Sequence, residues 1–345
     1  MRSEDGHNMH RWCCGLLLTF IALSSLWLQR AWCQSTDRTQ FIDSAKKEGE
    51  LVIYGSMNLR DANVLIGKFR EKYPFIDVKL NRLTSDKLYA RVISETRAGK
   101  FLADIVENNA LGLYFMKKAG LLAYYLSSED RFYPKDFKDQ GYWTTSNMNL
   151  HVTSYNTRRV ARDQLPKKWE DLLYPAWKGK MMLNPSEQWF SWILQIMGKE
   201  KGLKYMRELS QLNLTIRSES AAMRVDLIAA GEAALDIDST YGAVNLLKKR
   251  GAPIDWTTLG PVLVNLTGHG VAVRAPHPNA AKLFVDFILS QEGQGRVLSI
   301  DRWIIRSDLF SEQAAIKDLK LIPVNPALGE NMEYYARQSR EIFSK

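Results

Sequence analysis

The chain has little cysteine, and what it has is confined to one end. Cys13, Cys14 and Cys33 all lie within the first 33 of 345 residues. If that stretch is removed on export, the remaining chain has no thiol. It then forms no disulfide, binds no metal through thiolate and has no cysteine nucleophile. A chain of this length can bury a core large enough to fold without such links.

Histidine and nucleophile motifs are equally scarce. Beyond residue 33 the only histidines are His151, His269 and His277, far apart in the sequence. A zinc hydrolase would need paired histidines at helical spacing, and a serine hydrolase would need a Gly-x-Ser-x-Gly turn; neither is present. Paired carboxylates could still perform acid–base chemistry, so an exported enzyme stays open as the alternative class. We expect no enzyme, no cofactor and no bound metal.

Positive charge is abundant but scattered. The formal net charge is +9, of which about +8 belongs to the chain after residue 33. The densest basic clusters are short, as at 248–250, and lie at expected helix ends or loops. Nucleic-acid binding would need a concentrated basic face with aromatic side chains for base stacking, so we expect no nucleic-acid partner.

The first 33 residues have the composition of a secretory signal. Arg11 precedes the apolar run from Trp12 to Leu28, and Ala31-Trp32-Cys33 ends with small residues. A basic start, an apolar middle and a small-x-small end predict export to the periplasm. The run is only slightly shorter than a membrane span, so an uncleaved anchor stays open. Translation could begin at Met1 or at Met9.

From residue 50 onward, short β-rich runs alternate with helical patterns. The expected strands lie at 51–54, 77–83, 103–106, 180–183, 214–217, 234–237 and 270–273. Such alternation predicts α/β layers with mostly parallel sheets, in which ligands bind beyond the carboxyl ends of the strands. Those ends carry Ser, Asn, Asp and Glu repeatedly. Each such residue could cap the following helix, or some of them could line one site.

Several motifs resemble a known family. They are LVIYGSMN, FLADIVENNALGLYFMKKAGLL, LPKKWEDLLYPAWKGKMMLN, GEAALDIDSTYG and HPNAAKLFVDFILSQEGQGRVL. Together they resemble the periplasmic ABC-transporter solute-binding proteins of the ferric-iron-binding type, within extracellular solute-binding family 1. The resemblance extends from about Leu51 to Leu309.

The resemblance implies a two-lobed periplasmic-binding-protein fold of type II with a hinge between the lobes. After a signal peptide at 1–33, one lobe would comprise 34–145 plus 263–345, and the other 146–262. The protein would be a monomeric receptor that closes over a small molecule and delivers it to an inner-membrane ABC permease. Service to a sensor kinase instead of a permease stays open.

Iron ligation does not carry over with the motifs. The family's histidine position falls on Asn58, its glutamate on Asn109, and its two tyrosines on Tyr241 and Gly242. Three of the four implied ligands are therefore missing. Fe³⁺ prefers anionic oxygen ligands, so we predict that bare ferric iron is not the solute.

The residues expected to face the cleft are mostly neutral. Those implied for the first lobe are Ser56, Asn58, Asn108 and Asn109, and those for the second are Ser186, Trp189, Ser218, Ser220, Asp238 and Tyr241. The serines near 218–220 could hold an organic or phosphorus-containing anion, which is the preferred interpretation. Glu187, Glu219 and Asp238 would instead favour a polyamine if they faced inward with Trp189.

Overall fold

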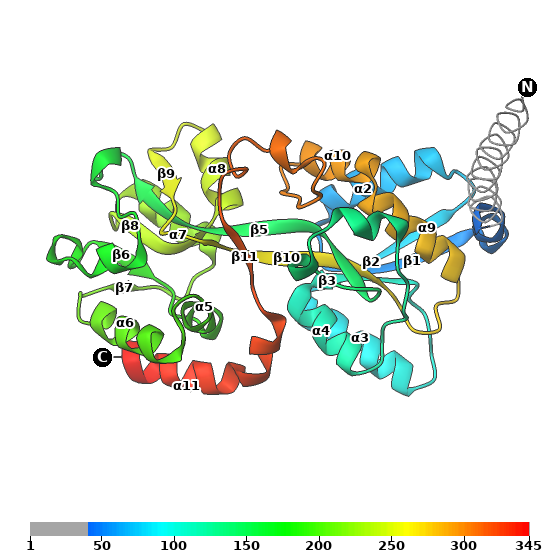
Figure 1. The fold of residues 1–345 in the computed structure, drawn as a ribbon, viewed down its shortest axis with the longest axis horizontal. Helices are drawn as coiled ribbons and strands as arrows, with labels where there is room; N and C mark the ends of the chain where they lie inside the picture. Colours follow the sequence, from blue (N-terminus) through cyan, green and yellow to red (C-terminus); the bar gives the residue numbers. More distant parts are fainter. Residues whose placement is uncertain (1–40, 345) are drawn as a thin grey trace, which may run out of the picture.

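The computed structural model describes residues 41–344. Its chain forms two α/β lobes joined by long strands (Figure 1). The expected signal at 1–33 lies outside the described residues. Within residues 41–344, no helix has the length and apolarity needed to span a bilayer.

The first lobe is a parallel sheet covered by helices. Its strands are β1 (Glu50–Gly55), β2 (Asp77–Arg82) and β3 (Ile105–Asn109), and its helices are α2 (Leu59–Lys72), α3 (Ser85–Arg97), α4 (Ala110–Lys118), α9 (Pro278–Leu289) and α10 (Gln291–Ser299). β1 lies between β2 and β3 and is parallel to both. Amphipathic spacing places Leu65, Ile66 and Phe69 of α2 on the face that packs on this sheet.

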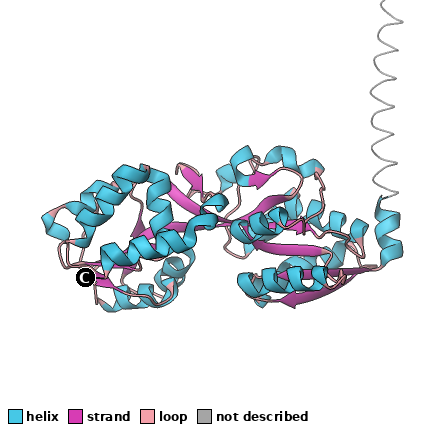
Figure 2. Cartoon of the chain, turned by 90° about the horizontal axis from the view of Figure 1, so that it is seen from below, coloured by secondary structure: helices cyan, strands magenta, loops and turns pink. Residues whose placement is uncertain are grey.

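The second lobe repeats this construction. It contains β6 (Met181–Leu183), β7 (Thr215–Ile216), β8 (Leu235–Thr240), β9 (Ile254–Thr257), α5 (Glu187–Met197), α6 (Lys199–Ser210), α7 (Ala221–Ala230) and α8 (Tyr241–Lys249). β6 pairs in parallel with β7 and β8. Figure 2 shows helices on both sides of the strands in each lobe. The expected α/β class is therefore confirmed, with parallel pairing among the inner strands of each lobe.

Two antiparallel strands cross between the lobes. They are β5 (Trp143–Asn156), with the short β4 (Lys138–Asp139) beside its start, and β10 (Val262–Val271). β5 pairs with β10 along its first half and with β8 and β9 along its second half. The sheet order is β2-β1-β3-β10-β5-β8-β6-β7, so one sheet path connects both lobes through this pair.

The C-terminal segment crosses between the lobes a third time. β11 (Leu321–Pro323) pairs with β10, and α11 (Met332–Phe343) packs against α5 and α6. We call residues 321–331 the strap; it includes the 3-10 helix η7 (Pro326–Asn331). The resemblance implied that this segment belongs to the first lobe, but Tyr335, Ile342 and Phe343 are buried in the second.

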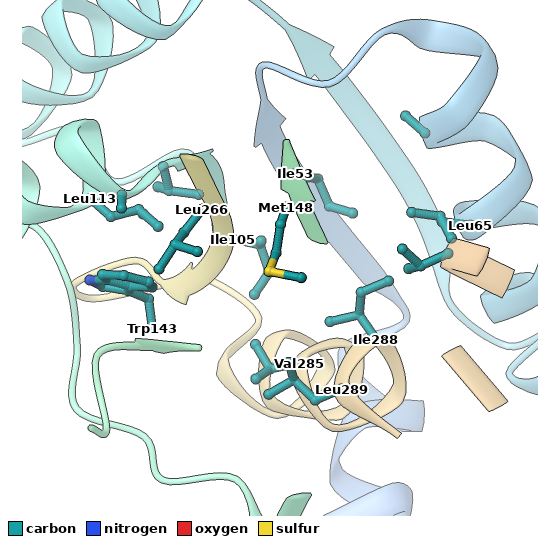
Figure 3. Close-up of a cluster of buried hydrophobic side chains, with 14 of the residues drawn as sticks. Ile53, Leu65, Ile105, Leu113, Trp143, Met148, Leu266, Val285, Ile288 and Leu289 are labelled. Carbon is teal, nitrogen blue, oxygen red and sulfur yellow. The ribbon is translucent and has the colours of Figure 1, made fainter. Parts of the chain in front are cut away.

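The hydrophobic core follows the same arrangement. One cluster fills the first lobe, continues along the β5–β10 pair and extends beneath α7 and α8 of the second lobe, where it includes Val225 and Val244. Figure 3 shows Met148 and Leu266 of the crossing strands among its side chains. A second cluster lies in the second lobe between the sheet, α5, α6 and α11. Further 3-10 helices occupy the loops at Ser128–Phe132, Lys135–Phe137, Arg162–Gln164, Trp169–Leu173, Pro175–Trp177 and Phe310–Glu312.

Candidate binding cleft

A polar cleft lies between the lobes. Its empty volume is about 860 Å³, including its open mouth. It is lined by Ser56, Ser85, Asn109, Ala110, Leu111, Asn149, Gln188, Trp192, Asn265, Leu266, Thr267, Val324, Asn325, Pro326, Leu328, Gly329 and Met332. Both lobes, both crossing strands and the strap contribute, and none of these lining side chains is ionisable.

The floor of the cleft is formed by the crossing strands. Asn149 of β5 and Asn265 of β10 are directly opposite each other in the ladder. Side chains alternate between the faces of a strand, so neighbours such as Met148 and Val264 are buried on the other side while these two amides face the cleft. The floor is a cross-strand pair of amides.

The Asn149 amide is oriented by an ion pair beside the cleft. Nη1 of Arg302 donates to Asn149 Oδ1 at 3.1 Å, and Nη2 of Arg302 donates to Asp61 Oδ2 at 2.7 Å. Burial alone would raise the pKa of Asp61, but hydrogen bonds from Arg302 and Asn58 outweigh it and lower that pKa. Because Arg302 occupies Oδ1, the Nδ2 group of Asn149 is left to donate to the cleft.

The Asn265 amide is oriented from the opposite side by His151. His151 Nε2 lies 2.9 Å from Asn265 Nδ2, and His151 Nδ1 lies 2.9 Å from Asp238 Oδ1. The edge of the Trp192 indole packs on the imidazole with 4.1 Å between ring centroids. A carboxylate accepts, so it favours the proton on Nδ1 and leaves the Nε2 lone pair for the amide.

The first-lobe wall depends on a buried carboxyl. Glu107 is 3% exposed and accepts the backbone N–H of Ser56 and of Met57, the latter at 2.9 Å. Burial raises the pKa of Glu107, although these N–H donors oppose the rise. Glu107 therefore holds the turn after β1 and places Ser56 at the cleft, while its own carboxyl lies beneath the surface.

Two helices begin at the cleft. Asn109 caps α4 by accepting the N–H of Gly112 at 2.8 Å, and Ser186 caps α5 by accepting the N–H of Trp189 at 3.2 Å. The first-turn residue Ala110 of α4 and the second residue of α5, Gln188, line the cleft. N–H groups in a first helical turn have no intrahelical acceptor, so both helix ends present partial positive charge.

The strap forms the remaining wall. Gln195 of α5 holds it, donating to Pro323 O at 2.9 Å and accepting from Asn325 N at 3.1 Å. On the first lobe, Glu330 binds Tyr114 and also Lys118, the latter at 2.7 Å. Gly329 packs closely here, since an added Cβ would lie 2.1 Å from Leu111 Cδ1 and the Leu111 side chain would have to move.

Sequence reasoning found part of this cleft. Of the residues it proposed, Ser56 and Asn109 line the cleft, and Ser186 caps a helix that reaches it. Asp238 lies one step away, behind His151. The floor amides and the strap were missed, although the Asn-x-Thr stretch at 265–267 carried an alternation that could have indicated a half-polar strand.

Two proposed residues do not face the cleft. Trp189 is 1% exposed and packs against Phe343 in the second-lobe core, so it has no indole face to offer a ligand. Asn108 is fully buried; it donates to Ser85 O at 3.3 Å and accepts the N–H of Asn109. Trp189 lies on the core-facing side of α5, and at the end of β3 the adjacent side chains of Asn108 and Asn109 point in opposite directions.

The other four proposed residues lie outside the cleft lining. Asn58 is exposed and caps α2, and Ser220 is exposed and caps α7. Ser218 is exposed in the loop before α7. Tyr241 packs between Trp256 and Trp303, with ring centroids 5.3 and 4.9 Å away, and burial raises its pKa. The alternative of simple helix capping describes Asn58 and Ser220.

Residues 41–344 contain no cluster of three His, Cys, Asp or Glu side chains that could hold a metal ion. Three of the four positions compared with iron ligands have different roles in the structure. Asn58 is a cap, Asn109 lines the cleft and Tyr241 is held between indoles. A hard cation would meet amide and hydroxyl groups in this cleft, without carboxylates.

Comparison with known proteins identifies the family. Residues 102–300 match the family described as bacterial extracellular solute-binding protein. The chain belongs to this family. It is a solute-binding protein of the ABC-importer type with the type II periplasmic-binding fold, as the sequence resemblance predicted.

Individual relatives of this solute-binding protein are distant. Iron uptake protein A1 of Synechocystis sp. is 22% identical over 76% of this chain and 77% of its own. A Trichodesmium protein (IdiA, FutA) in complex with iron and citrate superposes with a TM-score of 0.74, at 20% identity over 86% of this chain and all of the other. AfuA of Actinobacillus pleuropneumoniae with bound fructose-6-phosphate gives 0.67, at 22% identity over 86% and 99%. These structures show the shared fold.

Proposed function

We propose that this receptor captures a small hydroxylated organic anion, such as a sugar phosphate or a hydroxy acid, in the cleft between its lobes. It then delivers the solute from the periplasm to an ABC permease as a monomer, without catalysis. The observation that carries this proposal is a cleft lined by amides, hydroxyls and helix N-termini and by no ionisable side chain.

Neutral side chains of this kind suit hydroxyl groups. Asn149, Asn265, Gln188 and Thr267 each offer a donor, an acceptor or both, as a sugar or polyol does. The lining therefore supports a solute with several hydroxyl groups.

The helix ends support one negative group on the same solute. α4 and α5 begin on opposite sides of the cleft, at Ala110 and near Gln188. A phosphate or carboxylate there would receive backbone N–H donors and meet no carboxylate of the lining. A polyamine would meet the same positive helix ends without an anionic partner, so it is disfavoured.

Ferric iron is the second candidate, because relatives of this chain are named for iron uptake and one neighbour holds iron with citrate. The missing carboxylates and the position of Tyr241 between two indoles disfavour a bare ion. Ferric citrate would bring its own anionic ligands and is therefore included in the test below.

We also infer revised lobe boundaries. The first lobe comprises residues 41–145 and 263–320, and the second comprises 146–262 with α11. The strap joins them, because its ends are fixed to Tyr114 and Lys118 on one side and to Gln195 on the other.

The test is a binding panel on residues 34–345 with D-fructose 6-phosphate, citrate, ferric citrate, D-fructose and spermidine. A compound that binds only the folded state raises the melting temperature, and calorimetry then gives its Kd. We expect the hydroxylated anions to give the largest shifts. Spermidine as the strongest ligand would contradict the proposal.

Substitutions then place the site. Gln188→Leu and Thr267→Val each remove a hydrogen-bonding group from the lining, so affinity for the bound anion should fall about three- to tenfold. Gln164→Leu is the matched control, because Gln164 is equally exposed but lies in a loop outside the lining. Unchanged affinity in both cleft variants would rule out this site.

A further inference from the structure

We propose that His151 is a specificity-determining residue of this receptor. It fixes which end of the Asn265 amide faces the cleft, and reverses it on protonation. The inference rests on the proposed function, since it assigns the floor of that same cleft to the hydroxylated part of the solute.

The starting observation is that both floor amides are held from outside the cleft. Arg302 holds Asn149 by its oxygen, so Asn149 offers N–H donors. His151 holds Asn265 by its nitrogen, so Asn265 offers its oxygen. The two lie opposite each other in the ladder, and together they present a donor beside an acceptor. Hydroxyl or amide groups complement such a pair, whereas a carboxylate or phosphate, which only accepts, does not.

The two supports differ in chemistry. An arginine stays charged throughout the physiological range, so the orientation of Asn149 is permanent. An imidazole accepts through Nε2 only while it is neutral, because both ring nitrogens of the protonated form are donors. Protonated His151 would therefore need Asn265 Oδ1, and the amide would turn its Nδ2 group to the cleft. The floor would then present donors only.

The surroundings of the imidazole allow this change. Asp238 of β8 faces Nδ1 and accepts from it in either charge state. Arg224 of α7 lies one step further, where it donates to the backbone oxygen of Asp238 and pairs with the buried Asp236 at 3.2 Å. From α5 the neighbour is the uncharged Trp192, and from β10 it is Asn265. The remaining residues that line the small cavity beside the ring, among them Thr153, Pro261 and Leu263, have no ionisable side chain.

NMR of the side-chain nitrogens tests, without any ligand, whether protonation of His151 turns the Asn265 amide. In the full mature chain, the Asn265 amide resonance should shift with pH at the same midpoint as the His151 ring nitrogens. The Asn149 amide should stay constant and serves as the internal control. Resonances are assigned through Asn265→Asp and Asn149→Asp.

Two variants separate positioning from a merely structural role. In His151→Phe the Asn265 resonance should no longer change with pH. In Asp238→Asn, whose amide can donate to Nδ1 or accept from it, both tautomers become available and the Asn265 resonance should move towards its acid position at neutral pH. A flat Asn265 titration in the wild type, or one that persists in His151→Phe, would overturn the inference.

Binding of D-fructose 6-phosphate at neutral pH gives the functional readout. His151→Phe should weaken it about three- to tenfold, because the free Asn265 amide no longer presents a fixed acceptor. Unchanged affinity for this probe in His151→Phe would contradict the specificity role even if the NMR titration behaves as expected. Failure of every compound in the panel to bind would contradict the proposed function. The NMR titration would still show whether protonation of His151 turns the Asn265 amide.

Discussion

His151 and His269 lie on the two crossing strands but in opposite surroundings. At the cleft floor, His151 has partners on both ring nitrogens and its side chain is 14% exposed. In the first-lobe core, His269 lies beside Phe284 and a small apolar cavity, and its Nδ1 has no partner within residues 41–344. Burial lowers the pKa of His269 to about 3.

The difference shows how position on one strand pair decides the role of a histidine. Where a carboxylate and an amide meet the ring, its protonation state is transmitted to the ligand surface. Around His269 the neighbours are apolar apart from Glu107, its strand partner, and desolvation keeps the ring neutral, so it acts as packing. The same comparison extends to the ionisable groups around each histidine. The predictions below test it in order of decreasing expected effect.

The largest effect is expected at the buried Arg224–Asp236 ion pair near His151. Asp236 is fully buried, and burial raises its pKa to about 7 although Arg224 opposes the rise. Arg224→Met would leave this carboxyl without its cation and should lower the free energy of unfolding by about 3–5 kcal/mol. Chemical denaturation measures it. Arg217→Met is the control, because the partly exposed Arg217–Glu232 pair should contribute less than about 1 kcal/mol; equal losses would contradict the contrast.

A smaller, pH-dependent effect is expected at His269 in the first-lobe core. The unfolded chain protonates His269 near its ordinary pKa of 6.5, whereas the folded chain does so only near 3. Between these values the unfolded state binds more protons, so stability falls as pH falls. His269 is expected to lower the free energy of unfolding by about 2 kcal/mol as pH falls from 6.5 to 5. His269→Leu should remove this contribution, seen as a flatter unfolding free energy over that range; the same slope in both proteins would show that His269 does protonate when folded.

The smallest effect separates caps from ligand contacts. Ser220 accepts the N–H of Met223 at 3.3 Å at the start of α7, outside the cleft. Ser220→Ala should cost about 1 kcal/mol of stability and leave the affinity for D-fructose 6-phosphate unchanged. A loss of affinity in this variant would indicate that Ser218 and Ser220 do belong to the binding site.

The fold could be predicted from sequence much further than the site. Strand runs such as Leu51–Tyr54 and caps such as Asn58 are local signals, and the family motifs supplied the two lobes. The direction of a polar side chain at a strand end is not local. Asn108 and Asn109 are equivalent by composition, yet only Asn109 reaches the cleft, because α4 covers its neighbour. Likewise, only tertiary pairing brings His151 beside Asn265, 114 residues away.

The strap shows the same limit. The sequence does not indicate which lobe receives residues 321–343. Ser339 donates to Pro185 O, and Phe343 packs on Trp189; both contacts join parts of the chain more than 150 residues apart. Trp189, which the sequence predicted to face the cleft, instead packs on this C-terminal helix.

The central claim is that the solute binds between the lobes and draws them together. Residues 34–345 contain no cysteine, so spin labels at Lys87→Cys on α3 and Glu200→Cys on α6, both exposed, report one distance between the lobes. The measurement is made before and after saturation with D-fructose 6-phosphate and with citrate. The account predicts a shorter and narrower distance distribution with the compound that binds. Saturated binding with an unchanged distribution would contradict it.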